Sequence, residues 1–303
     1  MECRTDSRSA AVAGSSASFL NVNDTTTFTE AGRRWAELLA SWAIPDEIVS
    51  QGEVPPWSHD PATFAMDDTA DPTNPIFELA REILPLDGGT VLDIGCGGGR
   101  SSLPLFPRAR HITGVDTSRA MLDQFADAAN RLGVGHRELQ GRWPDVAIEA
   151  EMSGTPIEPA DVVVCHHVLF NVPDIEPFVV ALTAAARLGV VVVIPRRHPM
   201  SAWNAAWKHF WNIDRPEGPT SDDAIAVLRA LGIEPEVFDV PRPAMSRHAE
   251  DPAMLVDSAR RRLCLTSDRN GEIEEWLRHN PPDFMREVIV LRWPGGVESV
   301  GLS

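Results

Sequence analysis

The chain has 303 residues, of which 43% are hydrophobic and 23% charged, a composition that excludes a wholly disordered chain, a collagen-like repeat and a disulfide-stapled miniprotein. Its net charge is −17, and Lys208 is the single lysine among 27 basic residues, so we expect no basic stripe and no nucleic-acid partner. The four cysteines lack metal-ligand spacing and no apolar run could span a bilayer, which predicts a reduced, cytoplasmic protein with no metal site and no membrane contact.

The N-terminal part of the chain is predicted to be a tail followed by a helical and acidic segment. Residues 1–25 are rich in Ser, Ala and Thr and lack the apolar core of a signal peptide, so we expect a flexible tail. Thr27 and Glu30 have capping-box spacing, and large apolar residues follow at three- and four-residue steps, which predicts an amphipathic helix. These apolar residues are Trp35, Leu38, Leu39 and Trp42. Residues 44–75 carry seven carboxylates and no Lys or Arg, so we interpret residues 26–75 as a helical and acidic cap segment.

Residues 76–303 alternate between short apolar segments and amphipathic segments, the pattern of strands and helices in a doubly wound sheet. The predicted strands are residues 90–94, 111–115, 137–140, 161–165, 190–194, 236–240 and 287–293. The predicted helices are residues 76–84, one that begins after Gly99, 118–132, 177–187, 221–231 and 254–262. We therefore expect an α/β fold with one Rossmann-like domain over residues 76–303.

An aromatic-rich insertion, residues 195–219, follows the fifth predicted strand and does not have the pattern of an ordinary crossover. Trp203, Trp207 and Trp211 are spaced by four residues, which predicts one helix face. Core packing is the favoured interpretation of this series, although a helix at the carboxyl edge of the sheet could also form the wall of a ligand site. We therefore predict a helical cap, with His198, Trp203 and Trp207 as candidate substrate-binding residues. Trp57, in the acidic segment that could fold over the mouth of the site, is a fourth candidate.

A glycine-rich turn lies directly after the first predicted strand, over residues 93–99, and has the pattern D-x-G-x-G-x-G. Glycine lets the backbone turn sharply and approach a ligand closely. A nicotinamide fingerprint from Gly95 would need glycine where Arg100 stands, and no lysine follows to make a phosphate-binding P-loop. Asp116 lies at the end of the second strand, 116 − 95 = 21 residues beyond Gly95, where a carboxylate can accept hydrogen bonds from both hydroxyls of a ribose.

Three linked segments, residues 91–100, 115–122 and 160–169, resemble the class I S-adenosylmethionine-dependent methyltransferases, and the resemblance covers about residues 75–195. Residues 197–199 and 215–220 resemble a group of actinobacterial methyltransferases. The resemblance implies a seven-stranded sheet whose last strands include an antiparallel member. It also implies that S-adenosylmethionine is the cofactor and that a methyl group is transferred to a small organic acceptor.

By position, the resemblance implies that Asp93 and the backbone of Gly95, Cys96 and Gly97 hold the methionine part of the cofactor. Asp116 and Thr117 would bind the ribose, and Met121 would pack near the adenine. The family often has an acidic residue after the third strand, where this chain has Gly141, Arg142 and Trp143. We therefore expect the adenine to be held by backbone groups near Arg142 and by the face of Trp143.

His166 and His167 follow the fourth predicted strand, where the family places residues beside the transferred methyl group. Adjacent residues of an extended segment point to opposite faces, so at most one of them should face the methyl group. By family position we choose His166, either as a residue that orients the substrate or as a general base that titrates near pH 6.5. A packed neighbour of the cofactor is the alternative interpretation for both histidines.

Two other functions stay open at this point. The chain could bind S-adenosylmethionine without catalysis, as a sensor or partner protein, or it could be an NAD-dependent Rossmann oxidoreductase, which the missing third glycine disfavours. The acidic segment favours a basic or neutral small-molecule substrate over an anionic one.

Overall fold

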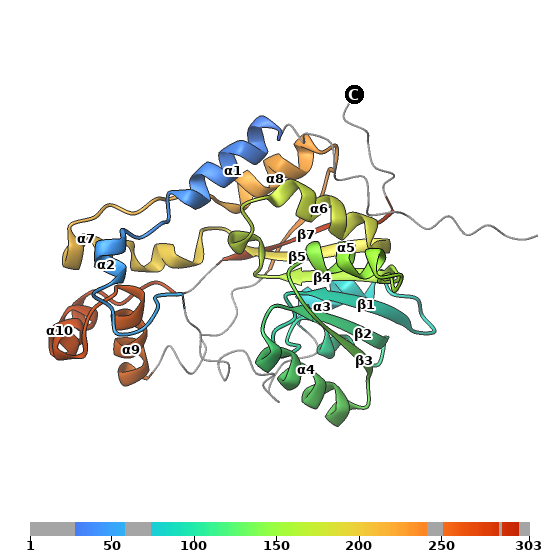
Figure 1. Cartoon of the computed structure of the whole chain (residues 1–303), viewed down its shortest axis with the longest axis horizontal. Coiled ribbons are helices and arrows are strands. Elements are labelled where there is room, and N and C mark those ends of the chain that lie inside the picture. Colours follow the sequence, from blue (N-terminus) through green and yellow to red (C-terminus); the bar gives the residue numbers. More distant parts are fainter. Residues whose placement is uncertain (1–27, 58–73, 241–250, 285–286, 297–303) are drawn as a thin grey trace, which may run out of the picture.

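A seven-stranded mixed sheet forms the centre of the protein (Figure 1). The computed structural model describes residues 28–57, 74–240, 251–284 and 287–296, so the predicted tail at residues 1–25 lies outside the described part. The strands are β1 Gly89–Ile94, β2 Ala109–Asp116, β3 Gly135–Gln140, β4 Ala160–His166, β5 Ala186–Pro195, β6 Glu236–Asp239 and β7 Val288–Pro294. Their order is β3-β2-β1-β4-β5-β7-β6, with β1 to β5 parallel and β7 antiparallel to both β5 and β6. The predicted fold class is confirmed.

Helices cover both faces of this sheet, as the nearly continuous apolar runs of its central strands require. The helices are α1 Glu30–Ala40, α2 Asp46–Val49, α3 Pro75–Arg81, α4 Arg119–Leu132, α5 Asp145–Met152, α6 Ile175–Ala184, α7 Asn204–Trp211, α8 Ser221–Ala230, α9 Pro252–Arg262 and α10 Asn270–His279. In β4, Val163 and Cys165 pack with α5, α6 and α8, while Val162 and Val164 pack with α3 and α4. Two hydrophobic cores therefore lie on the two faces of one sheet.

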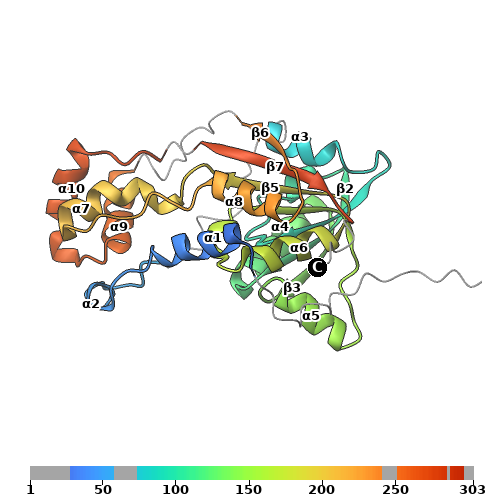
Figure 2. The same cartoon turned by 90° about the horizontal axis from the view of Figure 1, so that it is seen from above.

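Helix α1 lies against α6 and α8 on the outside of one core (Figures 1 and 2). Its N-cap is Thr29, whose hydroxyl accepts a hydrogen bond from the Gly32 N–H at 3.1 Å. Glu176 at the start of α6 accepts hydrogen bonds from the backbone N–H of Thr29, at 3.0 Å, and from its hydroxyl. The predicted capping box of Thr27 and Glu30 was therefore wrong, because the N-cap of α1 is Thr29, which donates hydrogen bonds to Glu176. Thr27 itself lies outside the described residues.

A second lobe, made of α2, α7, α9 and α10, lies beyond the carboxyl ends of the parallel strands (left in Figures 1 and 2). We call it the helical lobe. Its core contains Trp42, Met200, Trp203, Trp207, Leu263, Cys264, Leu265 and Ile273. Trp203 ends a 3₁₀ turn, Pro199–Trp203, whereas Trp207 and Trp211 belong to α7, so the three indoles do not share one helix as predicted.

The helix predicted to begin after Gly99 is absent from the described residues. A single 3₁₀ turn, Leu103–Leu105, lies between β1 and β2. Pro104 and Pro107 lack the N–H groups that an α-helix would need at these positions. The helix predicted over residues 177–187 ends earlier, at Ala184, because β5 begins at Ala186.

Candidate functional site

The predicted cofactor and catalytic residues follow or end four neighbouring strands, β1 to β4. From β1 the chain first adds β2 and β3 on one side of that strand and then crosses to add β4 and β5 on its other side, so the direction of winding switches between β1 and β4. Ligands of open α/β sheets bind at such a switch point, outside the carboxyl ends of the strands. The structure thus brings the segments after β1, β2, β3 and β4 to one edge of the sheet.

The glycine loop after β1 is held against the end of β2. The N–H groups of Gly95 and Cys96 both donate to the carbonyl oxygen of Val115, at 2.8 and 3.1 Å. Gly95 and Gly97 have φ angles of +72° and +50°, a conformation that favours glycine. A Cβ atom on Gly95 would lie 2.4 Å from Cγ2 of Val168, so the β1 loop packs directly on the segment that follows β4.

The carboxylate of Asp116 connects the glycine loop after β1 with the loop after β2. Its Oδ2 accepts a hydrogen bond from the N–H of Gly97 at 3.0 Å, and its Oδ1 accepts one from the N–H of Ser118 at 2.8 Å. A carboxylate has about four acceptor sites, so each oxygen retains one for a ligand hydroxyl. Asp116 is partly exposed, and Thr117 beside it is exposed, which fits the ribose contact predicted for this pair.

Asp93, by contrast, is completely buried. Its carboxylate accepts hydrogen bonds from the hydroxyl of Ser101, at 3.0 and 2.8 Å to the two oxygens, and from that of Ser102, at 2.6 Å. Burial raises the pKa of Asp93 to about 7, even though both serine hydroxyls act in the opposite direction. The sequence reasoning missed the two serines, whose only signal is a hydroxyl pair shortly after the glycine run.

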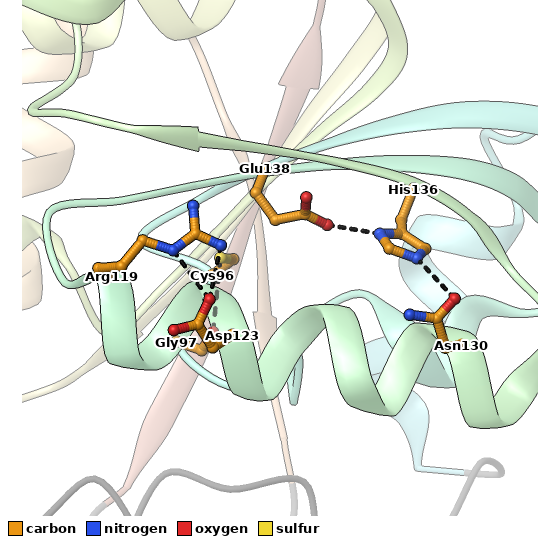
Figure 3. Close-up of polar contacts among 7 residues, drawn as sticks. All are labelled: Cys96, Gly97, Arg119, Asp123, Asn130, His136 and Glu138. Atoms are coloured by element: carbon orange, nitrogen blue, oxygen red, sulfur yellow. Dashed lines mark hydrogen bonds and ion pairs between the residues drawn. The ribbon is translucent and has the colours of Figure 1, made fainter.

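Cys96 lies in the loop with its thiol buried, and burial together with the nearby carboxylates raises the pKa of that thiol far above its usual value. Its Sγ donates a hydrogen bond to the carbonyl oxygen of Gly97 at 3.5 Å (Figure 3). Figure 3 also shows two polar pairs that the sequence reasoning did not single out. On β3, His136 Nδ1 and Glu138 Oε1 are 2.5 Å apart, and on α4 Arg119 pairs with Asp123 at 2.7 Å.

The three residues predicted to surround an adenine differ in how exposed their side chains are. Met121 lies partly buried in the first turn of α4, and Arg142 is exposed after β3. Trp143 is only 5% exposed and packs in the hydrophobic core with Ala147, so its indole lies mainly inside the protein. The carbonyl oxygen of Asp116 accepts a hydrogen bond from the N–H of Gly141 at 3.0 Å, which joins the ends of β2 and β3.

His166 ends β4, and burial and the neighbouring His167 lower its pKa to about 3. The imidazole is therefore neutral near pH 7, which favours the predicted orienting role over the general base that would titrate near pH 6.5. Its Nε2 atom is buried and has no hydrogen-bond partner among the residues that the structure describes. Buried nitrogens are nearly always paired in folded proteins, so this atom is suited to a ligand hydrogen bond.

His167 does not continue the strand. Its φ angle is +62°, its N–H donates to the carbonyl oxygen of Val193 at 2.8 Å, and the residue is exposed. The predicted alternation of faces therefore ends at His166, because the backbone turns at the next residue.

The four candidate substrate residues lie on the helical lobe or at its junction with the sheet. Trp203 and Trp207 are 2% and 1% exposed inside the core of the lobe, the favoured core position, whereas Trp57 is 47% exposed. His198 is buried at the junction, where its ring stacks on Trp42 with 4.0 Å between the ring centroids. Its ring also packs edge-to-face with Phe170, with 5.2 Å between the centroids. No group of three or more potential metal ligands lies within the described ranges.

Comparisons with known proteins match the part of the chain that contains these segments. Residues 92–194 match the family model described as a methyltransferase domain. Two curated relatives are called ubiquinone biosynthesis O-methyltransferase. The one from Aeromonas salmonicida (strain A449) is 37% identical over 109 residues, which are 36% of this chain and 43% of that enzyme. The one from Stutzerimonas stutzeri (strain A1501) is 36% identical over 93 residues, 31% and 38% of the two chains. The chain therefore spans less than half the length of these relatives.

Two solved structures complete the comparison. Coclaurine N-methyltransferase is 12% identical, with a TM-score of 0.49 over 87% of this chain and 86% of that one. Magnesium protoporphyrin IX methyltransferase from Synechocystis PCC 6803 is 15% identical, with a TM-score of 0.44 over 72% and 78%. Separately, none of the helices in the described ranges is both long and apolar enough to cross a membrane.

Proposed function

We propose that this chain, which carries a class I S-adenosylmethionine-dependent methyltransferase domain over residues 92–194, transfers a methyl group from that cofactor to a small organic acceptor. The observation that carries the proposal is the hydrogen bond from Gly97 to Asp116. It holds a glycine loop and a carboxylate with spare acceptor sites side by side at the carboxyl edge of the sheet, where the adenosine part of the cofactor can bind.

The residues at this edge fit the cofactor. Asp116 can accept hydrogen bonds from a ribose, and the positive φ angles of Gly95 and Gly97 bring backbone without side chains to the surface of the loop. The unpartnered Nε2 of His166 offers a polar contact at the end of β4. When bound, S-adenosylmethionine supplies a methyl group on a positively charged sulfur that is open to attack by a nucleophile.

The chain itself contributes orientation more than proton transfer. His166 is neutral because burial lowers its pKa to about 3, so it orients a neighbouring group by a hydrogen bond and is a poor proton acceptor near pH 7. Holding the acceptor in line at short range accounts for a large part of the rate of such transfers. In this proposal His166 is the residue closest to the methyl group, and His167 supports the backbone turn behind it.

The acceptor is proposed to be a neutral or basic small molecule, because the chain has a net charge of −17 and an acidic segment at residues 44–75. Nucleic acid is disfavoured by the same charge. A cytoplasmic location is proposed from the unpaired spacing of the four cysteines. Oxygen is the first acceptor atom to test, since the curated relatives carry the name O-methyltransferase. Residues 1–25, 26–75 and 76–303, with the insertion 195–219, are proposed to act as tail, cap segment and methyltransferase domain.

Calorimetric titration with S-adenosylhomocysteine tests the cofactor assignment, with NAD as the competing ligand. We expect S-adenosylhomocysteine to bind, Asp116→Ala to weaken binding, and Asp123→Ala to leave it unchanged. Asp123 is a matched control because its exposed carboxylate pairs with Arg119 on the nearby helix α4. Binding of NAD without S-adenosylhomocysteine would overturn the proposal in favour of an oxidoreductase.

Turnover separates an enzyme from a binding protein. The protein is incubated with S-adenosylmethionine and a panel of phenols, carboxylic acids and amines, and S-adenosylhomocysteine release is measured. Acceptor-dependent release supports the transferase, while tight cofactor binding without release on any acceptor favours the non-catalytic alternative.

A further inference from the structure

The loop after β1 closes on a buried carboxylate at its own start. Asp93, Ser101 and Ser102 are 0%, 7% and 0% exposed, and three short contacts from the two hydroxyls reach the two carboxylate oxygens. The residues between them include the whole glycine loop. The chain therefore returns to the strand it has just left, and side chains hold the closure.

Backbone hydrogen bonds fix the start of this loop, where the N–H groups of Gly95 and Cys96 donate to Val115, and its second half is held only by short-range turns. The N–H groups of Gly99 and Ser102 donate to the carbonyl oxygens of Cys96 and Gly99, at 2.9 and 3.3 Å. An α-helix over these residues would hold the loop by its first turn, but only the 3₁₀ turn Leu103–Leu105 follows. The path of the loop thus depends on the backbone contact to Val115 and on two carboxylates, Asp116 on the side of β2 and Asp93 beneath it.

We propose that Ser101 and Ser102 are positioning residues for the cofactor, which hold Asp93 so that the backbone of residues 95–97 keeps the shape that receives the methionine part. This inference rests on the proposed function. Removing a hydroxyl leaves a buried carboxylate oxygen without its donor, which is costly, so the loop must rearrange or Asp93 must take up a proton.

The electrostatic surroundings of Asp93 make this role measurable. Burial raises its pKa to about 7, the two serine hydroxyls lower it, and the negative charge of Asp116 raises it. The buried thiols of Cys96 and Cys165 also face this carboxylate and are uncharged at neutral pH. Loss of a serine hydroxyl should therefore shift the protonation of Asp93 to higher pH, which a change in packing alone would not do.

The test is the affinity for S-adenosylhomocysteine, titrated from about pH 6 to about pH 8 around the pKa of Asp93. We expect wild-type affinity to fall as the pH falls through this range. Ser101→Ala and Ser102→Ala should bind about tenfold more weakly, the effect of one lost hydrogen bond to a charged group, with the midpoint moved to higher pH. Ser101→Thr, which keeps the hydroxyl, should restore affinity. Ser153→Ala is the control, because that hydroxyl bonds to Ala150 and Thr155 at the C-terminal end of α5.

Asp93→Asn keeps the proposal testable if the alanine variants do not fold. An amide oxygen can still accept from the serines but does not titrate here, so we expect binding that is independent of pH in this range. Folded serine variants with wild-type affinity and an unchanged pH profile would overturn the positioning role and leave the proposed function standing. If the wild-type protein binds no S-adenosylhomocysteine at any pH, both are overturned.

Discussion

The carboxylate of Asp116 accepts a hydrogen bond from the backbone N–H of Gly97, 19 residues earlier in the chain, at 3.0 Å. This hydrogen bond joins the glycine loop after β1 to the acidic end of β2. The carboxylate is then both a support of the loop and a candidate ribose ligand, so substitutions at Asp116 must separate these two roles.

Asp116→Ala should weaken the binding of S-adenosylhomocysteine by about 1 to 3 kcal/mol, the scale for the loss of a charged acceptor. Asp116→Asn keeps an acceptor for Gly97 but removes the charge, so it should fall between Asp116→Ala and wild type. Calorimetry on both variants checks this order, with thermal unfolding to confirm the fold. Wild-type affinity in a folded Asp116→Ala protein would remove Asp116 from the ribose site.

Gly95→Ala should destabilise the protein more than Gly133→Ala, although both glycines have nearly the same φ angle, +72° and +73°. At Gly133 nothing lies within 4 Å of the added Cβ, so only backbone strain of about 1 to 2 kcal/mol applies. At Gly95 the Cβ would lie 2.4 Å from Val168, which adds about 1 to 3 kcal/mol of overpacking. Chemical denaturation measures both, and Val168→Ala should partly rescue Gly95→Ala. Equal losses at the two positions would contradict the close packing of the loops.

His166→Gln should lower turnover about tenfold, through one lost or displaced hydrogen bond, and change the affinity for S-adenosylhomocysteine less. Because the pKa of His166 is about 3, we expect no step near pH 6.5 in the pH profile of kcat that depends on His166. Wild type and His166→Gln should therefore have kcat profiles of the same shape in this range. Such a step in the wild-type kcat, absent from His166→Gln, would show that His166 acts as a base.

The same pKa makes His166 a source of acid sensitivity. The unfolded protein takes up a proton on His166 below about pH 6.5 while the folded protein does not until about pH 3, so this residue lowers stability as the pH falls through that window. His166→Gln should therefore lose less stability than wild type on acidification. Urea unfolding at several pH values measures the difference.

Asp93 should have the opposite effect on stability. Its pKa is about 7 in the folded protein against 3.8 for an ordinary aspartic acid, so the folded protein binds the extra proton between these values and loses stability as the pH rises through them. The slope for one proton is at most about 1.4 kcal/mol per pH unit. Asp93→Asn should lack this pH dependence, so its stability relative to wild type should increase from about pH 4 to about pH 7 and then stay level. A constant difference across this range would contradict the raised pKa.

Arg215 should be important for the helical lobe, because its guanidinium lies between two indoles, 5.4 Å from the ring centre of Trp42 and 5.0 Å from that of Trp207. It also donates hydrogen bonds to the carbonyl oxygens of Trp42 and Ala43. Arg215→Ala should cost about 1 to 3 kcal/mol of unfolding free energy. Arg229→Ala, which removes an exposed ion pair with Glu234, should cost clearly less. Denaturant unfolding of the two variants checks this difference.

The sequence by itself determined the seven strands and their alternation with helices, the glycine loop at residues 93–99 and the resemblance to a methyltransferase domain, which the family-model match over residues 92–194 supports. These features follow from local patterns. A buried parallel strand is a short apolar run, and a turn close to a ligand needs glycine at fixed steps, so both are visible in a few consecutive residues.

Only the tertiary structure decided the chemistry of the side chains at that edge. The hydroxyls of Ser101 and Ser102 reach Asp93 where a helix was predicted, and burial keeps His166 neutral where a titrating base was considered. Trp203 and Trp207 became the core of the helical lobe because residues from distant helices cover them. A pKa and a buried surface depend on which groups of the whole chain surround a residue, and spacing along the sequence does not contain that information.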